Sequence, residues 1–458
     1  MPIKSKNLTL TFCGGTGSVT GANFLLESDQ SKIVIDCGLE QGTTVANEFN
    51  HRTFSFNPAE IKVLLITHAH IDHIGKIPKL VKEGFKGVIY STPETRELSV
   101  LMLEDALKLT TQEAVRAKIP ALYNSDDVKK TFNMWKTIPY HTKTSITPDF
   151  EVYLKDAGHV LGSTMYEVLY NGKKIVFTGD LGNSPTPLLK DTEDITDADY
   201  LIMESVYGDR NHESKDDRRM KLEDVIEDTI LKKGVLMIPS FSLEKTQVIL
   251  YEINDLIEEG RVQSIPVYID SPLAIKITEI YKRFPVDFNP KTRALIKKGD
   301  DIFNFPKLHF TETSEESKAI LHTPNPKIII AGSGMSNGGR IMHHEINYLP
   351  HPENTLLQVG YQAVNSIGRH ISDGAHEIDI FGHHIKINAR IEHIDGYSSH
   401  KDSEHLLEFV DKTSDTVKKI FVAMGEPKSS MFLVQKIRDN LALEAYAPKE
   451  GDKVILEC

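Results

Sequence analysis

The stretch Thr67-His68-Ala69-His70-Ile71-Asp72-His73-Ile74-Gly75 decides the fold of this chain, and it follows directly on an apolar run. An extended segment points residues two apart to the same side, so His68 and His70 can offer nitrogens to one cation where a strand ends. Asp72 and His73 lie beyond the turn and face a neighbouring position. One loop therefore predicts two adjacent sites with ligands that suit zinc and, less well, manganese or iron.

Further polar residues follow other predicted strands at the point where each strand ends. Asp36 ends the strand 32–36, Asp180 follows the strand 174–179, and Glu204 follows the strand 201–203. A carboxylate at Asp180 is well placed to bridge two cations, because each of its oxygens can contact one. Asp36 is either a ligand or, more readily, an acceptor that orients a metal-bound histidine. His159 follows the strand 152–154 and is the candidate third ligand of the first cation.

Composition narrows the class of protein. The chain has 458 residues, more than a single hydrophobic core usually contains. This length predicts two or three domains. A net charge of -12 argues against a protein that coats nucleic acid over its whole surface, and leaves a local basic or metal-lined cleft open. No apolar run approaches the roughly 20 residues that span a bilayer, so no membrane association is expected. The amino terminus has no signal-peptide core, which predicts a cytoplasmic protein.

The three cysteines fit neither a disulfide framework nor a zinc ribbon. Cys13, Cys37 and Cys458 are too widely and irregularly spaced for either, and we expect them to be reduced.

From about residue 209 strands and helices alternate, which predicts a parallel α/β domain. Within it, the segment Gly332–Arg340 follows a strand and precedes a helical pattern. Such a glycine-rich loop can bring backbone N–H groups and a helix start close to a phosphate, with Arg340 as a partner for that phosphate. A plain connection between strand and helix is the alternative interpretation. The last segment, Ile394 to His400, follows alternating strands. It again contains side chains of the kind that act at metal sites.

These motifs together resemble the β-CASP nucleases, a branch of the metallo-β-lactamase superfamily. The resemblance is carried by Asp36, the His68 to His73 loop, His159, Asp180 and Glu204 in Met-Glu-Ser-Val-Tyr-Gly. It is carried further by the Gly332 loop, by Val359-Gly360-Tyr361-Gln362 with Ile367-Gly368-Arg369, and by Ile394 to His400. This branch includes the messenger-RNA 3′-end cleavage endonuclease, ribonuclease J and related bacterial and archaeal RNA-processing enzymes.

The resemblance implies an α/β fold, namely a metallo-β-lactamase αββα sandwich with an inserted parallel α/β β-CASP domain. Residues 1–208 and 385–458 would form the two parts of the metallo-β-lactamase domain, and residues 209–384 the β-CASP domain. RNA, expected to be single-stranded, would lie in the groove between the domains. A homodimer is left open.

The resemblance also assigns roles to individual residues. The metal ligands would be His68, His70, Asp72, His73, His159 and Asp180, with Asp36 behind them as an orienting group. The catalytic residues would be Asp72, Asp180, Glu204 and His400. The substrate-binding residues would be Ser333, Gly334, Ser336, Asn337, Arg340 and Arg369. A metal-activated hydroxide would attack the scissile phosphorus, and His400, paired with Glu204, would assist the phosphate or protonate the leaving oxygen.

One residue departs from the family pattern. The family places a histidine in a Val-His-Gly-Glu stretch near the end of the chain, where this sequence has Ala423-Met424-Gly425-Glu426. A thioether is a soft, neutral ligand and suits zinc poorly among nitrogen and oxygen donors. We therefore expect one tightly bound zinc and a weaker second one.

Three hypotheses about function follow from the sequence. The first is a metal-dependent ribonuclease that hydrolyses RNA phosphodiester bonds by endo- or exonucleolytic cleavage. The second is a degenerate, non-catalytic RNA-binding relative, an idea that Met424 favours. The third is a metallohydrolase of a small ester or other phosphodiester, which would be favoured if RNA neither binds nor inhibits.

Overall fold

A computed structural model describes residues 8–42, 46–363 and 365–458. The amino-terminal residues 1–7, on which the absence of a signal-peptide core partly rests, lie outside the described residues. The chain forms two compact units. Unit 1 consists of Met1–Ser184, Asp191–Asn211 and His400–Cys458, and unit 2 consists of Pro185–Lys190 and His212–Ser399.

Unit 1 contains two seven-stranded sheets, each partly antiparallel and partly parallel. The first sheet has, in spatial order, the strands β22 (Lys453–Leu456), β1 (Leu8–Gly14), β2 (Asn23–Glu27), β3 (Lys32–Ile35), β4 (Val63–Leu65), β5 (Val88–Ser91) and β6 (Trp135–Thr137). The second has β21 (Ala445–Tyr446), β20 (Lys419–Val422), β11 (Tyr200–Met203), β10 (Lys173–Phe177), β9 (Thr164–Tyr170), β8 (Glu151–Asp156) and β7 (Thr144–Ser145). Strands β3 to β6 are parallel, as are β10, β11, β20 and β21, so their carboxyl ends share one edge in each sheet.

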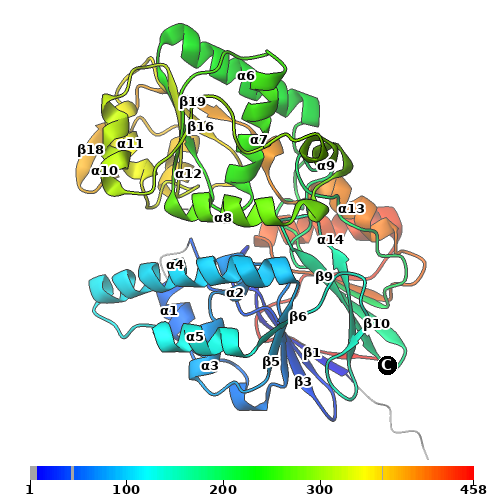
Figure 1. The fold of residues 1–458 in the computed structure, drawn as a ribbon. Coiled ribbons are helices and arrows are strands. Elements are labelled where there is room, and N and C mark those ends of the chain that lie inside the picture. Colours follow the sequence, from blue (N-terminus) through cyan, green and yellow to red (C-terminus); the bar gives the residue numbers. More distant parts are fainter. Residues whose placement is uncertain (1–7, 43–45, 364) are drawn as a thin grey trace, which may run out of the picture. The chain divides into compact units, whose positions relative to one another are not determined.

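Helices cover the outer face of each sheet in unit 1 (Figure 1). On the first sheet lie α1 (Ala46–His51), α2 (Ile71–Ile74), α3 (Ile77–Lys82), α4 (Pro93–Ala117) and α5 (Ser125–Asn133), with the short 3-10 helix η1 (Pro58–Glu60) nearby in the chain. On the second lie α13 (Ser403–Asp411) and α14 (Pro427–Leu441). The order of layers is helix, sheet, sheet, helix, which is the predicted αββα sandwich.

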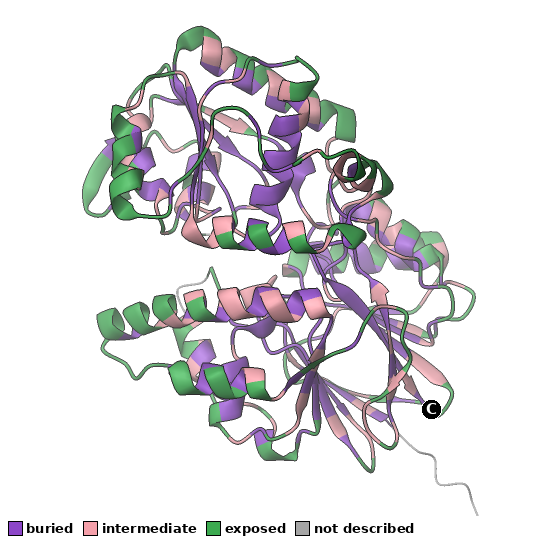
Figure 2. Cartoon of the chain, in the orientation of Figure 1, coloured by how far each residue is buried: buried purple, intermediate pink, exposed green. Residues whose placement is uncertain are grey.

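The main core of unit 1 lies between the two sheets. Alternate residues of facing strands fill it, among them Phe12, Phe24, Leu154, Phe177 and Phe421, all buried. The sheets thus bury one face against each other and the other face beneath helices, and Figure 2 shows strands that are buried almost throughout while the outer helix faces are exposed. Strands buried on both faces read in sequence as continuous apolar runs, which explains the runs before His68 and Asp180.

Unit 2 contains a six-stranded parallel sheet. Its strands are, in spatial order, β14 (Leu308–Phe310), β13 (Val267–Asp270), β15 (Lys327–Ala331), β12 (Val235–Pro239), β16 (Thr355–Gln358) and β19 (Arg390–His393), and a separate hairpin pairs β17 (Glu377–Ile380) with β18 (His383–Lys386). Its α-helices are α6 (Lys215–Lys232), α7 (Lys245–Glu258), α8 (Pro272–Arg283), α9 (Pro290–Lys297), α10 (Ser314–Ala319), α11 (Ile341–Tyr348) and α12 (Ile367–Ser372). Three 3-10 turns, η2 (Pro285–Asp287), η3 (Ile320–His322) and η4 (Asp395–Tyr397), complete the unit. The parallel α/β domain predicted from residue 209 onward is confirmed.

The longest helix of unit 1 is α4, which runs without a break from Pro93 to Ala117. Thr92 caps its start by accepting the backbone N–H of Thr95, and Lys118 ends it in a left-handed conformation. All three cysteines are free thiols, as expected. Among the described residues no helix is long and apolar enough to cross a membrane.

The buried core of unit 1 yields a first prediction. Leu154 on β8 is fully buried between the sheets, whereas Leu109 on α4 is 53% exposed. We expect Leu154→Ala to reduce the free energy of unfolding by about 2–5 kcal/mol, because it removes buried methyl groups and leaves a cavity. Urea unfolding followed by the fluorescence of Trp135, the single tryptophan of the chain and a member of unit 1, measures the loss.

The matched control is Leu109→Ala, which should change the free energy of unfolding by no more than about 0.5 kcal/mol. Equal unfolding midpoints for the two variants would contradict the assigned core.

Candidate metal centre

The metal loop of unit 1 is held in place by backbone contacts with the segment that follows β3. The carbonyl oxygen of Asp72 accepts the N–H of Ala22 at 3.0 Å, and that of His73 accepts the N–H of Cys37 at 2.7 Å. Gly38 is required for this approach, since a Cβ atom there would lie 1.4 Å from the Asp72 carbonyl oxygen. The loop therefore depends on a glycine about thirty residues earlier in the chain.

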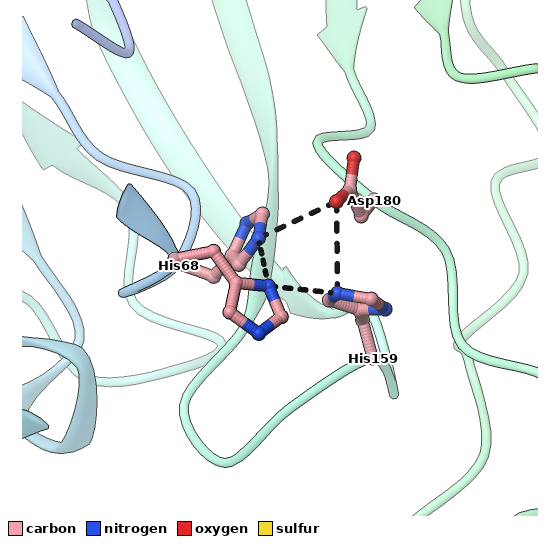
Figure 3. A group of neighbouring side chains, drawn as sticks. His68, His159 and Asp180 are labelled. Carbon is pink, nitrogen blue, oxygen red and sulfur yellow. Dashed lines mark hydrogen bonds and ion pairs between the residues drawn. The ribbon is translucent and has the colours of Figure 1, made fainter. Parts of the chain in front are cut away.

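Four side chains from different elements converge at the edge of the two sheets and could hold one cation: His68, His70, His159 and Asp180. His68 follows β4, His159 follows β8, and Asp180 follows β10. One oxygen of Asp180 lies 3.5 Å from Nε2 of His68 and 3.6 Å from Nε2 of His159. Nδ1 of His70 lies 3.1 Å from His68 Nε2 and 3.2 Å from His159 Nε2. Figure 3 shows the side chains of His68, His159 and Asp180 directed toward one another.

Asp36 organises the second half of the loop from behind. Its two carboxylate oxygens accept the backbone N–H and the hydroxyl of Thr67, each at 2.8 Å. One of them also lies 2.8 Å from Nδ1 of His73. This contact turns Nε2 of His73 toward Asp180, 3.5 Å away, and toward Asp72, 4.0 Å away. The geometry is that of an acceptor that fixes a histidine for metal binding, the more favoured of the two roles expected for Asp36.

A third group of side chains lies beside Asp180. Nδ1 of His400 is 3.1 Å from a Glu204 oxygen and 4.0 Å from Asp180. The Glu204 carboxylate is fully buried and also accepts the backbone N–H groups of Leu181 and Val206. His400 is therefore anchored through Glu204 next to the candidate cation cluster, and its ring centroid is 4.6 Å from that of His159.

The pKa values of His68, Asp72 and His73 are set by burial and by the charges of neighbouring side chains. Burial, aided by the neighbouring His73, holds the pKa of His68 well below its usual range, so this imidazole is a neutral donor. Burial also raises the pKa of Asp72 to about 6. For His73 burial acts in the opposite direction, but Asp180 and Asp36 outweigh it and raise the pKa well above the ordinary value.

Burial and neighbouring charges also set the pKa values of Asp180, Glu204 and His400. For Asp180, burial opposes ionisation, yet His73 and His68 hold the pKa of the carboxyl well below its usual range. Burial raises the pKa of Glu204, and Glu204 in turn raises the pKa of His400 against the effect of burial. A raised pKa on both members means that Glu204 and His400 hold a proton between them readily.

Met424 lies where the family pattern has its last histidine. It is buried, has a left-handed backbone with φ 44°, and lines a small cavity together with Asp36, His73 and Glu204. Its sulfur packs against Gly15, where a Cβ atom would come within 2.5 Å of it. The loop is fixed because the Ser205 N–H donates to the Met424 carbonyl oxygen and the Ser205 hydroxyl to that of Ala423. The thioether therefore belongs to the apolar core.

The donor set fits a divalent cation. Among the described residues, Nε2 of His73 and Oδ1 of Asp180 are buried and have no hydrogen-bond partner. Buried polar atoms are rarely left so, which is the expected state of ligands whose partner is an ion. Three imidazole nitrogens and a carboxylate oxygen suit zinc at the first position. Asp72 and His73 belong to neither of the compact ligand clusters found among the described residues.

The residues predicted to bind substrate lie in unit 2, on the loop between β15 and α11 and on α12. Several of their side chains have partners within the protein. Arg340 donates to Asp270 at 2.7 Å and to the carbonyl oxygens of Thr311 and Glu312. Arg369 pairs with Asp373 at 2.9 Å. The hydroxyl of Ser336 donates to the buried Glu345.

The remaining residues of this set shape the loop. Asn337 accepts the N–H of Ile367 through its side-chain oxygen and donates its own N–H to the Ser333 hydroxyl. The carbonyl oxygen of Gly334 accepts the side-chain amide of Gln362. The substrate-binding role of these residues stays a prediction.

Sequence reasoning missed two groups that matter for these sites. Thr67 connects the metal loop to Asp36, and Asp270 holds both Arg340 and His344, the latter at 2.7 Å. Asp270 ends a predicted strand, as Asp36 does, so the same signal could have revealed it. No signal in the sequence distinguishes Thr67 from an ordinary threonine.

Comparison with known proteins places this geometry in a family. Three domain families match the chain: the metallo-beta-lactamase superfamily over residues 19–227, the Beta-Casp domain over 246–371, and the Zn-dependent metallo-hydrolase RNA specificity domain over 384–448. Ribonuclease TTHA0252 of Thermus thermophilus is 32% identical over 397 residues, which cover 87% of this chain and 89% of that protein. The chain belongs to the β-CASP family of the metallo-β-lactamase superfamily.

Other β-CASP relatives are archaeal. Transcription termination factor FttA of Methanosarcina mazei is 31% identical over 460 residues, covering 97% of this chain and 71% of that protein. The FttA of Pyrococcus abyssi is 30% identical over 472 residues, covering 99% and 72%. A crystal structure of a protein of unknown function from Enterococcus faecalis V583 superimposes with a TM-score of 0.56 at 10% identity, over 98% of this chain and all of that one. That likeness concerns the fold alone.

The domain divisions at residues 208/209 and 384/385 stay predictions. The compact units and the three matched segments divide this β-CASP chain at different residues. The family match and the histidine and aspartate cluster together establish divalent-metal binding as a property of the fold.

The first cluster yields a prediction about metal content. We expect His159→Ala to lower the metal that copurifies with the protein by at least about tenfold, because it removes one donor from the compact cluster. Elemental analysis of the purified protein measures the ratio. The exposed His141, whose Nε2 contacts Glu193, offers a matched control. If His141→Ala lost as much metal as His159→Ala, the assigned cluster would be wrong.

Proposed function

We propose that this β-CASP protein is a metal-dependent ribonuclease that hydrolyses RNA phosphodiester bonds. The observation that carries the proposal is the His68, His70, His159 and Asp180 cluster with the Glu204–His400 pair directly beside it. A cation site next to an anchored proton carrier is what phosphodiester hydrolysis requires. The names of the relatives and the matched RNA specificity domain support RNA as the substrate.

We assign roles to the residues as follows. His68, His70 and His159 would hold a first cation, Asp180 would contribute a carboxylate to it and to a second, and Asp72 and His73 would bind that second cation. A bound cation supplies two effects, namely a water of lowered pKa and compensation of charge on the phosphate. Asp36 keeps His73 in the required orientation through its contact with Nδ1.

His400 supplies the proton at the leaving oxygen, and Glu204 positions it. Glu204 raises the pKa of His400 against the effect of burial, which favours the protonated imidazole that a general acid must be before the bond breaks. We propose single-stranded RNA as the substrate, because a segment without base pairs can follow a protein surface and expose its phosphates.

We propose that the glycine loop Gly332–Arg340 contacts RNA phosphates mainly through its backbone. Among the described residues the N–H groups of Gly338 and Gly339 have no acceptor, whereas Arg340 is already paired with Asp270. Backbone N–H groups at a helix start favour an anion. Arg369, on α12, could join them only by leaving Asp373.

A degenerate, non-catalytic RNA-binding relative is the second candidate, and Met424 is the observation that favours it. The other eight residues of the predicted site argue against it, since a site without function would be expected to lose more than one of them. They are His68, His70, Asp72, His73, His159, Asp180, Glu204 and His400. A metallohydrolase of small esters remains the third candidate, and it is distinguished by the choice of substrate in the assay.

The cleavage assay tests these candidates together. End-labelled and internally labelled single-stranded RNAs are incubated with the zinc-loaded protein and with His70→Ala and Asp180→Asn. We expect cleavage by the native protein and a loss of at least about a hundredfold in both variants, because each removes a cation ligand. His141→Ala should cleave normally.

Unchanged cleavage in both ligand variants would refute the proposed centre. RNA binding without cleavage by the native protein would favour the non-catalytic relative. Hydrolysis of small esters without any effect of RNA would favour the third candidate.

The proposal that zinc occupies one position tightly and the other weakly has a test of its own. Met424→His should raise bound zinc from nearer one to nearer two per chain, because an imidazole then complements Asp72 and His73. Histidine tolerates the left-handed backbone of this position better than most residues. Elemental analysis gives the ratio.

Met424→Leu, which keeps the apolar shape, is the matched control and should leave the zinc content as it is. Two fully occupied, tightly held zinc ions in the native protein would overturn this assignment.

A further inference from the structure

An aromatic ring lies exposed beside the glycine loop of unit 2. Phe241 is on the turn between β12 and α7 and is 40% exposed, whereas Ser240 and Leu243 on the same turn are each 2% exposed. Single exposed apolar residues are common on protein surfaces, so exposure alone assigns no role to this ring. Its position in the sheet and its contacts do.

The turn that contains Phe241 lies where the order of the strands reverses. From β12 the chain passes β15 to reach β13, and from β15 it passes β12 in the opposite direction to reach β16. Right-handed crossovers therefore lead the chain from these two neighbouring strands to opposite faces of the sheet. In open parallel sheets, ligands bind outside the carboxyl ends of two such strands, where the loops that follow them separate. Here those loops are the Phe241 turn and the glycine loop 332–340.

The two loops touch at Gly334. A Cβ atom there would lie between 2.7 and 3.0 Å from three ring atoms of Phe241, so the ring occupies space that only a glycine leaves open. On the same residue, the carbonyl oxygen accepts the side-chain amide of Gln362 at 3.1 Å. The ring thus packs on the loop whose N–H groups at Gly338 and Gly339 have no acceptor among the described residues.

The backbone that presents the ring is fixed. The carbonyl oxygen of Phe241 accepts the N–H of Thr246 at 3.2 Å and the hydroxyl of the same residue at 2.8 Å. The N–H of Ser240 donates to Ala331, the last residue of β15, at 3.0 Å. An aromatic side chain on a fixed backbone has only two rotatable bonds, so little conformational entropy is lost when a ligand covers it.

Polar groups border the ring. The hydroxyls of Ser242 and Ser271, both half-buried, lie 3.2 Å apart at the carboxyl ends of β12 and β13. A Cβ atom on Gly332 would lie 3.9 Å from each hydroxyl oxygen, so these groups adjoin the glycine loop as well. An apolar partner would cover hydroxyl and N–H groups without pairing them, which is costly. A ligand with one flat apolar face and several polar atoms suits these surroundings better.

We propose that Phe241 stacks on a base of single-stranded RNA whose phosphate lies on the glycine loop. The inference rests on the proposed function and adds a contact with a base to the contact with the phosphate. Every base has a π face, and in single-stranded RNA that face is free to stack on an aromatic side chain. Phe241 is therefore a further substrate-binding residue, and it acts on any sequence.

The first experiment measures RNA binding in the Asp180→Asn background, where cleavage is expected to be lost. Phe241→Ala should weaken the binding of a single-stranded oligoadenylate by about fivefold to a hundredfold, the range that one stacked base accounts for. Phe241→Tyr keeps the ring and should bind as before. The matched control is Phe310→Ala, which removes a ring that is 37% exposed on β14 of the same unit and should leave binding unchanged.

RNA without bases distinguishes stacking from a merely structural role of the ring. The same proteins are tested with an oligomer of equal length in which every nucleotide is abasic. Phe241→Ala should bind this ribose–phosphate chain as well as the protein with Phe241 does, because no base is there to stack. A loss of the same size with the complete and the abasic oligomer would mean that the ring only shapes the loop, and would overturn the proposal.

Phe241→Trp supplies a spectroscopic test. The chain has one tryptophan, Trp135, which is 5% exposed, so the introduced indole is the one that an RNA base can reach. We expect its fluorescence to be quenched by saturating oligoadenylate and unchanged by the abasic oligomer. Unchanged fluorescence with both would contradict stacking at this position.

The results separate this inference from the proposed function. If Phe241→Ala binds oligoadenylate as tightly as the protein with Phe241, the stacking role is wrong and the ribonuclease assignment stands. If the protein with Phe241 binds neither oligomer, the proposed function is contradicted, and the stacking role with it.

Discussion

The carboxylate of Asp36 is the interaction on which the metal centre depends. It stands at the end of β3 and binds the backbone and the hydroxyl of Thr67 and one nitrogen of His73. Each of these contacts fixes a different part of the metal loop. Asp36 is itself 1% exposed, so these donors replace the water that an exposed carboxylate would bind, and loss of any one would weaken the hold on the loop. The same contacts that stabilise the loop thus select the nitrogen that His73 presents.

The two halves of the centre differ in how completely the protein builds them. His68, His70 and His159 meet Asp180 in a compact cluster, whereas His73 lines a small cavity together with Met424, whose sulfur packs on Gly15. A soft thioether embedded in the core cannot replace an imidazole as a donor. The asymmetry has a structural origin, because the Met424 loop is tied to Ser205 and so to the strand end that carries Glu204. The Met424 side chain thus packs in the core without disturbing the geometry of the neighbouring cluster.

In unit 2, side chains that the sequence assigned to phosphate binding have partners within the protein. The arginines expected to bind phosphate are paired, Arg340 with Asp270 and Arg369 with Asp373. Within the loop, the hydroxyl of Ser336 donates to the buried Glu345. The side-chain partners of this loop were therefore not readable from its glycine-rich sequence.

The sequence by itself determined the class of fold and the polar side chains that stand at the ends of its strands. Closely spaced histidines after an apolar run, and carboxylates at the ends of Lys32–Ile35, Lys173–Phe177 and Tyr200–Met203, identify strand ends because local periodicity and composition are readable without tertiary contacts. Only the tertiary structure decided which partner each polar side chain takes. Thr67 binds Asp36, and Glu345 lies under Ser336, because chain segments far apart in sequence, or on opposite sides of a turn, meet only after the sheets and helices have packed.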